Sequence, residues 1–208
     1  MADPITAPAA SLAERKRQLV RDELADAAVK ILALRGYEDT TVEQIADAVG
    51  VSRRTFFRYF PSKDDVIVHL LAGAGTQLSA ELRARPAGEP AAVALRHALS
   101  PFIAFSIDQP DKTLHLSRLI LNTPALLGRF LERQAHWQAD ITAILAQRTG
   151  LDPRADPRPA LAAGIALTAF NTALRRWADS DGTQPLADLA DQAFALAAPA
   201  LDLPTDTS

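Results

Sequence analysis

The sequence predicts an all-α protein of about nine helices, with a small N-terminal domain of three helices and a larger helical domain behind it. Apolar residues recur at spacings of three and four through most of the chain, as they do on one face of a helix. No segment shows the sustained alternation of apolar and polar residues that is typical of a strand, so we expect no sheet. Helix-capping and helix-ending residues stand at the boundaries of the periodic segments.

The composition limits the classes of function. The chain has 208 residues, 22 Lys and Arg against 25 Asp and Glu, and a net charge of −3. This balance argues against a protein that coats nucleic acid by bulk charge, so any anion binding must come from a local cluster. The absence of Cys excludes a disulfide framework and a thiolate metal site. Neither a signal-peptide core nor a membrane-length apolar run is present, so we expect a soluble cytoplasmic protein without a membrane partner.

The first helix follows a Pro- and Ala-rich segment, residues 1–14, that we expect to form a flexible arm. Helical periodicity begins near Lys16 and ends at Gly36, which we expect to be a left-handed cap. The spacing of Thr40 and Glu43 predicts a capping box at the start of the second helix.

The second and third helices are short. Gly50 ends the second helix, and Ser52 is placed to cap a third helix over residues 53–60, which Pro61 ends. Ser62 and Asp65 predict the cap of a fourth helix. This part of the chain, residues 15–62, is the predicted N-terminal domain.

The larger predicted domain spans residues 63–203, before a flexible tail at 204–208. Loops rich in Pro and Gly are expected at 84–90 and 150–159. Its predicted helices cover residues 63–83, 91–108, 112–121, 125–148, 160–178 and 186–201. The helix at 160–178 is apolar almost all round and should be buried on most sides.

The two short helices around "VGVS" have the layout of a helix-turn-helix, whose second helix enters the major groove of DNA. Phe56 and Phe60 are four residues apart and are expected to face the core. The arginines lie on or near the opposite face, at Arg53, Arg54 and Arg58. Since a guanidinium fits the O6 and N7 atoms of guanine, this face predicts base reading. The alternative, a solvated basic face, is less favoured in this context.

Other polar residues are placed for contacts with the DNA backbone. Thr55 is suited to a thymine methyl group or a phosphate, and the Tyr59 hydroxyl to a phosphate, although Tyr59 can also be half-buried. Lys63, at the start of the next helix, predicts a phosphate clamp, and Thr41 is placed similarly. The basic start of the first helix adds three candidates for which a solvated helix face is nearly as plausible, Arg15, Lys16 and Arg17.

The segment "GYEDTTVEQIADAVGVSRRTFFRYFPSKDDVI" resembles the N-terminal domain of TetR-family transcriptional regulators, over about residues 21–70. The resemblance implies an all-α homodimer whose C-terminal domain binds a small molecule and dimerises through its last two long helices, here Ala160–Ala178 and Leu186–Leu201. It also implies a palindromic double-stranded DNA operator and, for most members, repression that an inducer relieves. Residues 91–201 resemble C-terminal domains common in actinobacterial members, more weakly.

Position by position, the resemblance implies base reading at Arg53 and Arg54 and backbone contacts at Thr55, Tyr59 and Lys63. The helix cap Ser52 belongs to the same predicted interface. The chain departs from the family at Phe57, where most members have Tyr, so the hydroxyl–phosphate bond is absent. We expect Phe57 to stack on a sugar or to pack, and Arg58 to contact the phosphate instead.

A small-molecule site needs an apolar cavity with a few polar groups. Candidates are polar or aromatic residues embedded in the apolar helices: Phe102, Phe105, His115, Arg118, Phe130, Trp137, Asn171 and Arg175. Each has a plainer alternative: a wet surface for His115 and Arg118, and a hydrogen bond across the dimer for Asn171. The effector is left open between an acyl-CoA, a carboxylate and an aromatic drug.

Two other classes of function fit the sequence less well. A helical enzyme has little support, because the chain lacks Cys and its four His are scattered. His136 and Asp140, four residues apart, are better explained as a surface pair than as metal ligands. We therefore expect no enzyme activity, no cofactor and no metal. An architectural DNA-binding protein without an inducer is the third possibility, and it would bind DNA with little sequence preference.

Overall fold

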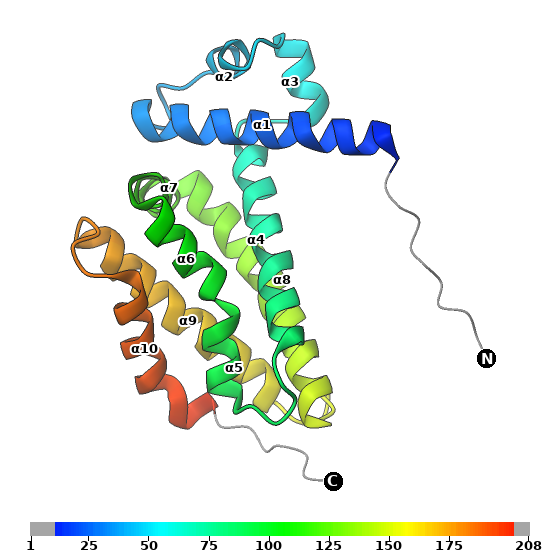
Figure 1. The fold of residues 1–208 in the computed structure, drawn as a ribbon, viewed down its shortest axis with the longest axis vertical. Helices are drawn as coiled ribbons and strands as arrows, with labels where there is room; N and C mark the ends of the chain where they lie inside the picture. The colour runs from blue at the N-terminus through cyan, green and yellow to red at the C-terminus, as the bar shows by residue number, and fades with distance from the viewer. Residues whose placement is uncertain (1–10, 202–208) are drawn as a thin grey trace. The chain divides into compact units, whose positions relative to one another are not determined.

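The computed structural model describes residues 11–201, and these form ten α-helices without a strand (Figure 1). The all-α prediction is confirmed, with one helix more than the nine expected. The predicted tail at 204–208 and most of the predicted arm lie outside the described residues. The chain divides into two compact units between Val66 and Ile67. The helices are α1 Leu12–Arg35, α2 Val42–Ala48, α3 Arg53–Tyr59, α4 Asp64–Ala84, α5 Ala91–Ala98, α6 Ser100–Asp108, α7 Pro110–Asn122, α8 Pro124–Thr149, α9 Arg158–Asp179 and α10 Leu186–Leu201.

Helix α1 starts earlier than its periodicity predicts. Ser11 and Glu14 form a capping box, in which the Ser11 hydroxyl accepts from the Glu14 N–H and the Glu14 carboxylate accepts from the Ser11 N–H. Residues 12–14 are therefore helical rather than part of a loose arm. At the other end, Gly36 has φ 85° and ψ 166°, so it ends the helix with a positive φ but is not the expected left-handed cap.

The capping box of α2 lies one residue later than predicted. Thr41 is the cap, and its hydroxyl and backbone N–H bond with Gln44. Thr40 is instead buried, and its hydroxyl donates to the Gly36 carbonyl at 2.7 Å. Thr40 therefore bonds the residue that ends α1, and Thr41 caps the start of α2.

The predicted helix at 91–108 is two helices, α5 and α6, that meet at Leu99. Pro101 explains the break, because proline has no N–H for the bond to the preceding turn and its ring crowds that turn. The other predicted helices of this unit are present with ends shifted by up to two residues, and 186–201 is unchanged.

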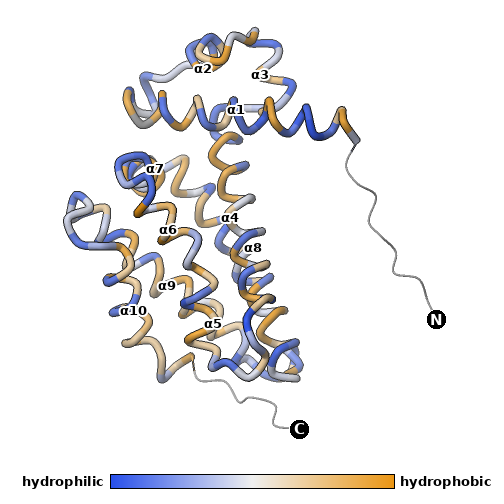
Figure 2. Tube along the Cα trace, in the orientation of Figure 1, coloured by the Kyte–Doolittle hydropathy of each residue, from blue (hydrophilic) through white to orange (hydrophobic). Residues whose placement is uncertain are grey.

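The core of the second unit lies between its C-terminal helices. Helix α9 packs against α8 on one side and α10 on the other, and α5 contacts both α9 and α10. A buried cluster joins α6, α9 and α10 through Ile103, Ala173, Trp177, Leu186, Leu189 and Ala190. The hydropathy of each residue along these helices is shown in Figure 2. The expectation that the 160–178 helix is buried on most sides is only partly met, because Leu161, Thr168, Thr172, Arg175 and Arg176 stay exposed.

Candidate nucleic-acid interface and small-molecule pocket

Helix α3 is held in the N-terminal unit by its aromatic face. The Phe56 and Phe60 rings are fully buried, with their centroids 5.7 Å apart, and the Arg21 guanidinium lies 5.2 Å from the centre of the Phe60 ring. The Ser52 hydroxyl caps the helix by accepting from the Thr55 N–H at 3.1 Å. The predicted cap, Ser52, and the predicted core residues, Phe56 and Phe60, are confirmed. The two buried rings hold α3 against the unit, so its opposite face is exposed.

The arginines on that outer face differ in how they are held. Arg53 pairs with Glu43 of α2 at 2.9 Å and lies 5.4 Å from the centre of the exposed Phe57 ring. Arg58 lies 5.2 Å from the centre of the Tyr59 ring. Arg54 is exposed, and no hydrogen bond or ion pair engages its guanidinium in the part of the chain that the structure describes. Arg54 therefore has its full set of N–H donors available for a partner outside the protein.

The threonines of the interface have local hydrogen bonds. The Thr55 hydroxyl lies 3.0 Å from the Ser52 hydroxyl, at the start of α3. Thr41 is exposed at the start of α2, where it serves as the cap. Tyr59 is partly buried, as the plainer alternative had it. These positions leave Thr41 and Thr55 at two helix N-termini, where backbone N–H groups favour anions.

Lys63 lies one residue before α4 rather than in its first turn. Its ammonium donates to the carbonyls of Tyr37 and Thr40, at 2.6 and 3.2 Å. The Tyr37 hydroxyl in turn donates to the Asp64 carboxylate. Lys63 thus ties the start of α4 to the α1–α2 turn, a role that the sequence did not suggest.

Arg15, Lys16 and Arg17 are all exposed on the first two turns of α1. Glu14 is adjacent, and the hydrogen bonds it accepts, first from the Ser11 backbone and then from the Ser11 side chain, lower the pKa of its carboxyl. Glu14 is therefore committed to the helix cap, and the three cations extend the positive surface of this helix.

The eight small-molecule candidates do not converge on one site. Arg118 and Arg175 line a common pocket. Phe130 and Trp137 pack edge to face, 6.0 Å apart, and both are buried. The remaining four lie elsewhere: Phe102 packs on Phe170, Asn171 exchanges hydrogen bonds with Gln134 of its own chain, and Phe105 and His115 are exposed.

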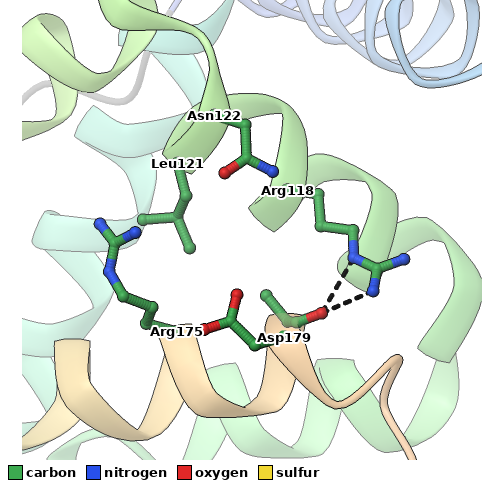
Figure 3. Close-up of a pocket in the computed structure, with 6 residues that line it drawn as sticks. Arg118, Leu121, Asn122, Arg175 and Asp179 are labelled. Atoms are coloured by element: carbon green, nitrogen blue, oxygen red, sulfur yellow. Dashed lines mark hydrogen bonds between the residues drawn. The ribbon is translucent and has the colours of Figure 1, made fainter.

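The pocket that joins Arg118 to Arg175 has a volume of about 420 Å³ and lies between the C-terminal ends of α7 and α9 (Figure 3). Its other lining residues are Leu121, Asn122, Ala178 and Asp179. Asn122 and Asp179 were not predicted from the sequence, although both are polar residues at the ends of apolar helices. Their position at helix ends was the only signal, and it also fits ordinary surface residues.

A second hollow is an apolar groove along α9 and α10. Its walls are small or aliphatic residues, among them Gly164, Ile165, Ala169 and Ala193, and Gln138 of α8 closes one side. Leu161 and Leu196 line it and are 58% and 87% exposed. Exposed leucines on a groove of small residues are the composition of a helix-packing surface without its partner.

Neither a metal-binding cluster nor a membrane-spanning helix is found among the described residues. No group of three or more His, Cys, Asp or Glu side chains is arranged to hold a metal ion among residues 11–201. Over the same range, no helix is long and apolar enough to cross a membrane.

Comparison with known families matches both units. Residues 24–70 match the family described as "Bacterial regulatory proteins, tetR family", and residues 89–202 match the family described as "MftR C-terminal domain". The first match covers α2, α3 and the interface residues from Thr41 to Lys63. The second covers both hollows described above.

Relatives with assigned names are similar over most of their length. The transcriptional regulator TcmR of Streptomyces glaucescens is 35% identical, over 82% of this chain and 79% of its own. The regulator MftR of Mycobacterium tuberculosis, named for mycofactocin biosynthesis, is 31% identical, over 81% of this chain and 86% of its own. Among solved structures, the regulator FadR of Bacillus subtilis in complex with stearoyl-CoA has a TM-score of 0.64 and 18% identity, covering 86% of this chain and 98% of its own.

Proposed function

The chain belongs to the TetR family of bacterial DNA-binding transcriptional regulators, and we propose that it represses its targets by binding a palindromic operator as a homodimer. A small-molecule effector releases it from the operator. The proposal assigns the protein a regulatory role and no catalysis. Since its target is chromosomal DNA, the proposed site of action is the cytoplasm.

The observation that carries the DNA-binding part of the proposal is that α3 has a buried aromatic face and an exposed basic face. Its buried rings, Phe56 and Phe60, fix the helix, and its exposed face presents Arg54 without a partner in the described residues. We propose that the Arg54 guanidinium contacts a guanine. Arg53 is assigned to a second base contact, with its guanidinium oriented by the salt bridge to Glu43. Thr41, Thr55, Tyr59 and the α1 cations are assigned to the phosphate backbone.

The groove on α9 and α10 supports the homodimer. A second copy of the chain is the proposed occupant of the groove. A twofold axis would pack α9 and α10 of one subunit against α9 and α10 of the other, and it would bury Leu161 and Leu196 of both subunits. The resulting bundle would use Ala160–Ala178 and Leu186–Leu201 from each subunit. Two α3 helices would then read half-sites about one helical turn apart, ~34 Å.

The effector part of the proposal is supported by the second unit. FadR of Bacillus subtilis, a fold neighbour, was solved with stearoyl-CoA bound. A helical unit of this fold can therefore hold an amphipathic, negatively charged molecule. We propose an effector of this general character for the present chain.

The proposed function is tested by two DNA experiments on the purified protein. A footprint upstream of its own gene and of the nearest divergent gene should show a protected palindrome. Selection from a random duplex library does not depend on knowing the operator, and it should enrich a palindrome with half-sites one turn apart. If the library yields no enriched motif while the protein still binds DNA evenly, the proposal is wrong and an architectural role takes its place.

A further inference from the structure

The pocket between α7 and α9 brings two arginines to one opening (Figure 3). Arg118 and Arg175 line it together with the Asp179 carboxylate. The Asp181 carboxylate pairs with Arg118 beside the pocket, which leaves Arg175 as the lining arginine without an ion pair in the described residues. The two arginines come from different helices and lie on opposite sides of the opening in Figure 3, with Asn122 at a third side. The pocket therefore offers cationic and amide donors from several directions.

Arg118 is fixed in place by α9. Its Nε and Nη2 atoms donate to the Ala178 carbonyl at 2.9 and 2.6 Å, and Nη2 also donates to the Asp181 carboxylate. These bonds leave Nη1, with its two N–H groups, for another acceptor. Because the guanidinium is planar and rigid, holding one edge also sets the direction of the other.

Arg175 is held by nothing in the described residues. It is exposed on α9, and although Asp179 lies one helical turn further on, the two side chains form no ion pair. An arginine that lines a hollow without a carboxylate partner is suited to an anion from solution, since it loses no internal bond when the anion arrives. The Asn122 amide can donate to the same group.

We propose that this pocket binds the oxyanion group of the effector, a carboxylate or a phosphate, between Arg118 and Arg175. The inference rests on the proposed function for its regulatory meaning but names a site that can be measured without DNA. Arg175 and Arg118 supply the cationic donors, and Asn122 supplies a neutral one. Asp179 limits the affinity, because its carboxylate repels the bound anion.

Isothermal titration of the full chain, at fixed ionic strength, tests this site with two probes, inorganic pyrophosphate and sodium decanoate. Saturable binding of pyrophosphate identifies a phosphate group as the preferred ligand, and binding of decanoate alone identifies a carboxylate; either result supports the site. Arg175→Gln should weaken that binding about tenfold or more, as expected when a hydrogen bond between charged groups is lost. Asp179→Asn should strengthen it.

Arg176→Gln is the matched control, because it removes the same charge from the next residue of α9, which does not line the pocket. Its affinity should equal that of the wild type. The inference is overturned if neither probe binds at millimolar concentration, or if Arg176→Gln loses as much affinity as Arg175→Gln. DNA binding is measured separately without probe. A protein that binds DNA but neither anion overturns only this inference, and one that binds an anion but no DNA contradicts only the proposed function.

Discussion

The Lys63 ammonium lies 3.8 Å from the centre of the Tyr37 ring and donates to the Tyr37 carbonyl at 2.6 Å. A residue that sequence reasoning assigned to DNA phosphate therefore also connects the start of α4 to the α1–α2 turn. An ammonium has three N–H groups, and the Tyr37 and Thr40 carbonyls take two of them. A phosphate contact stays a prediction, and it is compatible with this structural role.

Lys63→Ala should lower the free energy of unfolding of the N-terminal unit by about 1–2 kcal/mol, because two charge-assisted hydrogen bonds are lost at a partly buried site. Urea unfolding followed by circular dichroism measures the change. Lys30→Ala removes an exposed lysine of α1 and should leave the transition unchanged. Equal stability of the two variants would show that the Lys63 contacts contribute nothing.

Ser52→Asp should separate helix capping from DNA binding. Aspartate caps helices as well as serine does, so the free energy of unfolding should stay within about 0.5 kcal/mol of the wild type, while Ser52→Ala should lower it by about 1 kcal/mol. The added carboxylate at the start of α3 should nevertheless weaken DNA binding by repelling phosphate. Unchanged DNA affinity of Ser52→Asp, measured by fluorescence anisotropy, would place the start of α3 away from DNA.

Two glycines of α4 should respond to alanine in opposite directions. A Cβ on Gly75 would clash with Nε1 of the buried Trp137 indole, whereas a Cβ on Gly73 would meet nothing within 4 Å. Gly75→Ala should therefore destabilise the protein by about 1–3 kcal/mol through overpacking. Gly73→Ala should stabilise it by about 0.5–1 kcal/mol, because alanine is the better helix former. Thermal unfolding that shifts both variants in the same direction would contradict the close packing of Gly75 against Trp137.

Leu196→Glu should convert the proposed dimer to a folded monomer, since it sets a charge in a groove that a second copy is proposed to cover. Leu131→Glu, on an exposed position of α8 outside the groove, is the control and should stay dimeric. Sedimentation equilibrium gives the mass of each variant, and circular dichroism checks its helix content. A dimeric Leu196→Glu, or a monomeric wild type, would rule out this interface.

Local patterns in the sequence were enough to predict the helix-turn-helix. The spacing of Phe56 and Phe60 identified the buried face of α3, and the Ser52 cap was also correct. The signals that were missed were local as well: the Ser11–Glu14 capping box and the break that Pro101 imposes. Reading these two signals would have given the correct start of α1 and the tenth helix.

The pocket was not predictable in the same way. Arg118 and Arg175 were both chosen as candidates, but periodicity does not say how far α7 and α9 are shifted along each other. That shift brings Asn122 and Asp179 beside the arginines and leaves His115 exposed. Asn171 was a candidate for the small-molecule site, with a hydrogen bond across the dimer as the plainer alternative, yet it pairs with Gln134 of its own chain, because α8 and α9 pack side by side.

The central claim is that Arg54 reads a base from the exposed face of α3. The most direct test is to measure the affinity of the wild-type protein and of two variants for the selected operator and for random duplexes. Arg54→Ala should weaken the binding free energy for the selected operator by about 1–3 kcal/mol and relax the sequence preference at one base pair of each half-site. Its affinity for random DNA should change little. Arg17→Ala, at one of the three exposed cations at the start of α1, should weaken binding to both duplexes to a similar extent and reduce the salt dependence of binding. If Arg54→Ala instead weakens both duplexes equally, or neither, α3 does not read sequence through Arg54.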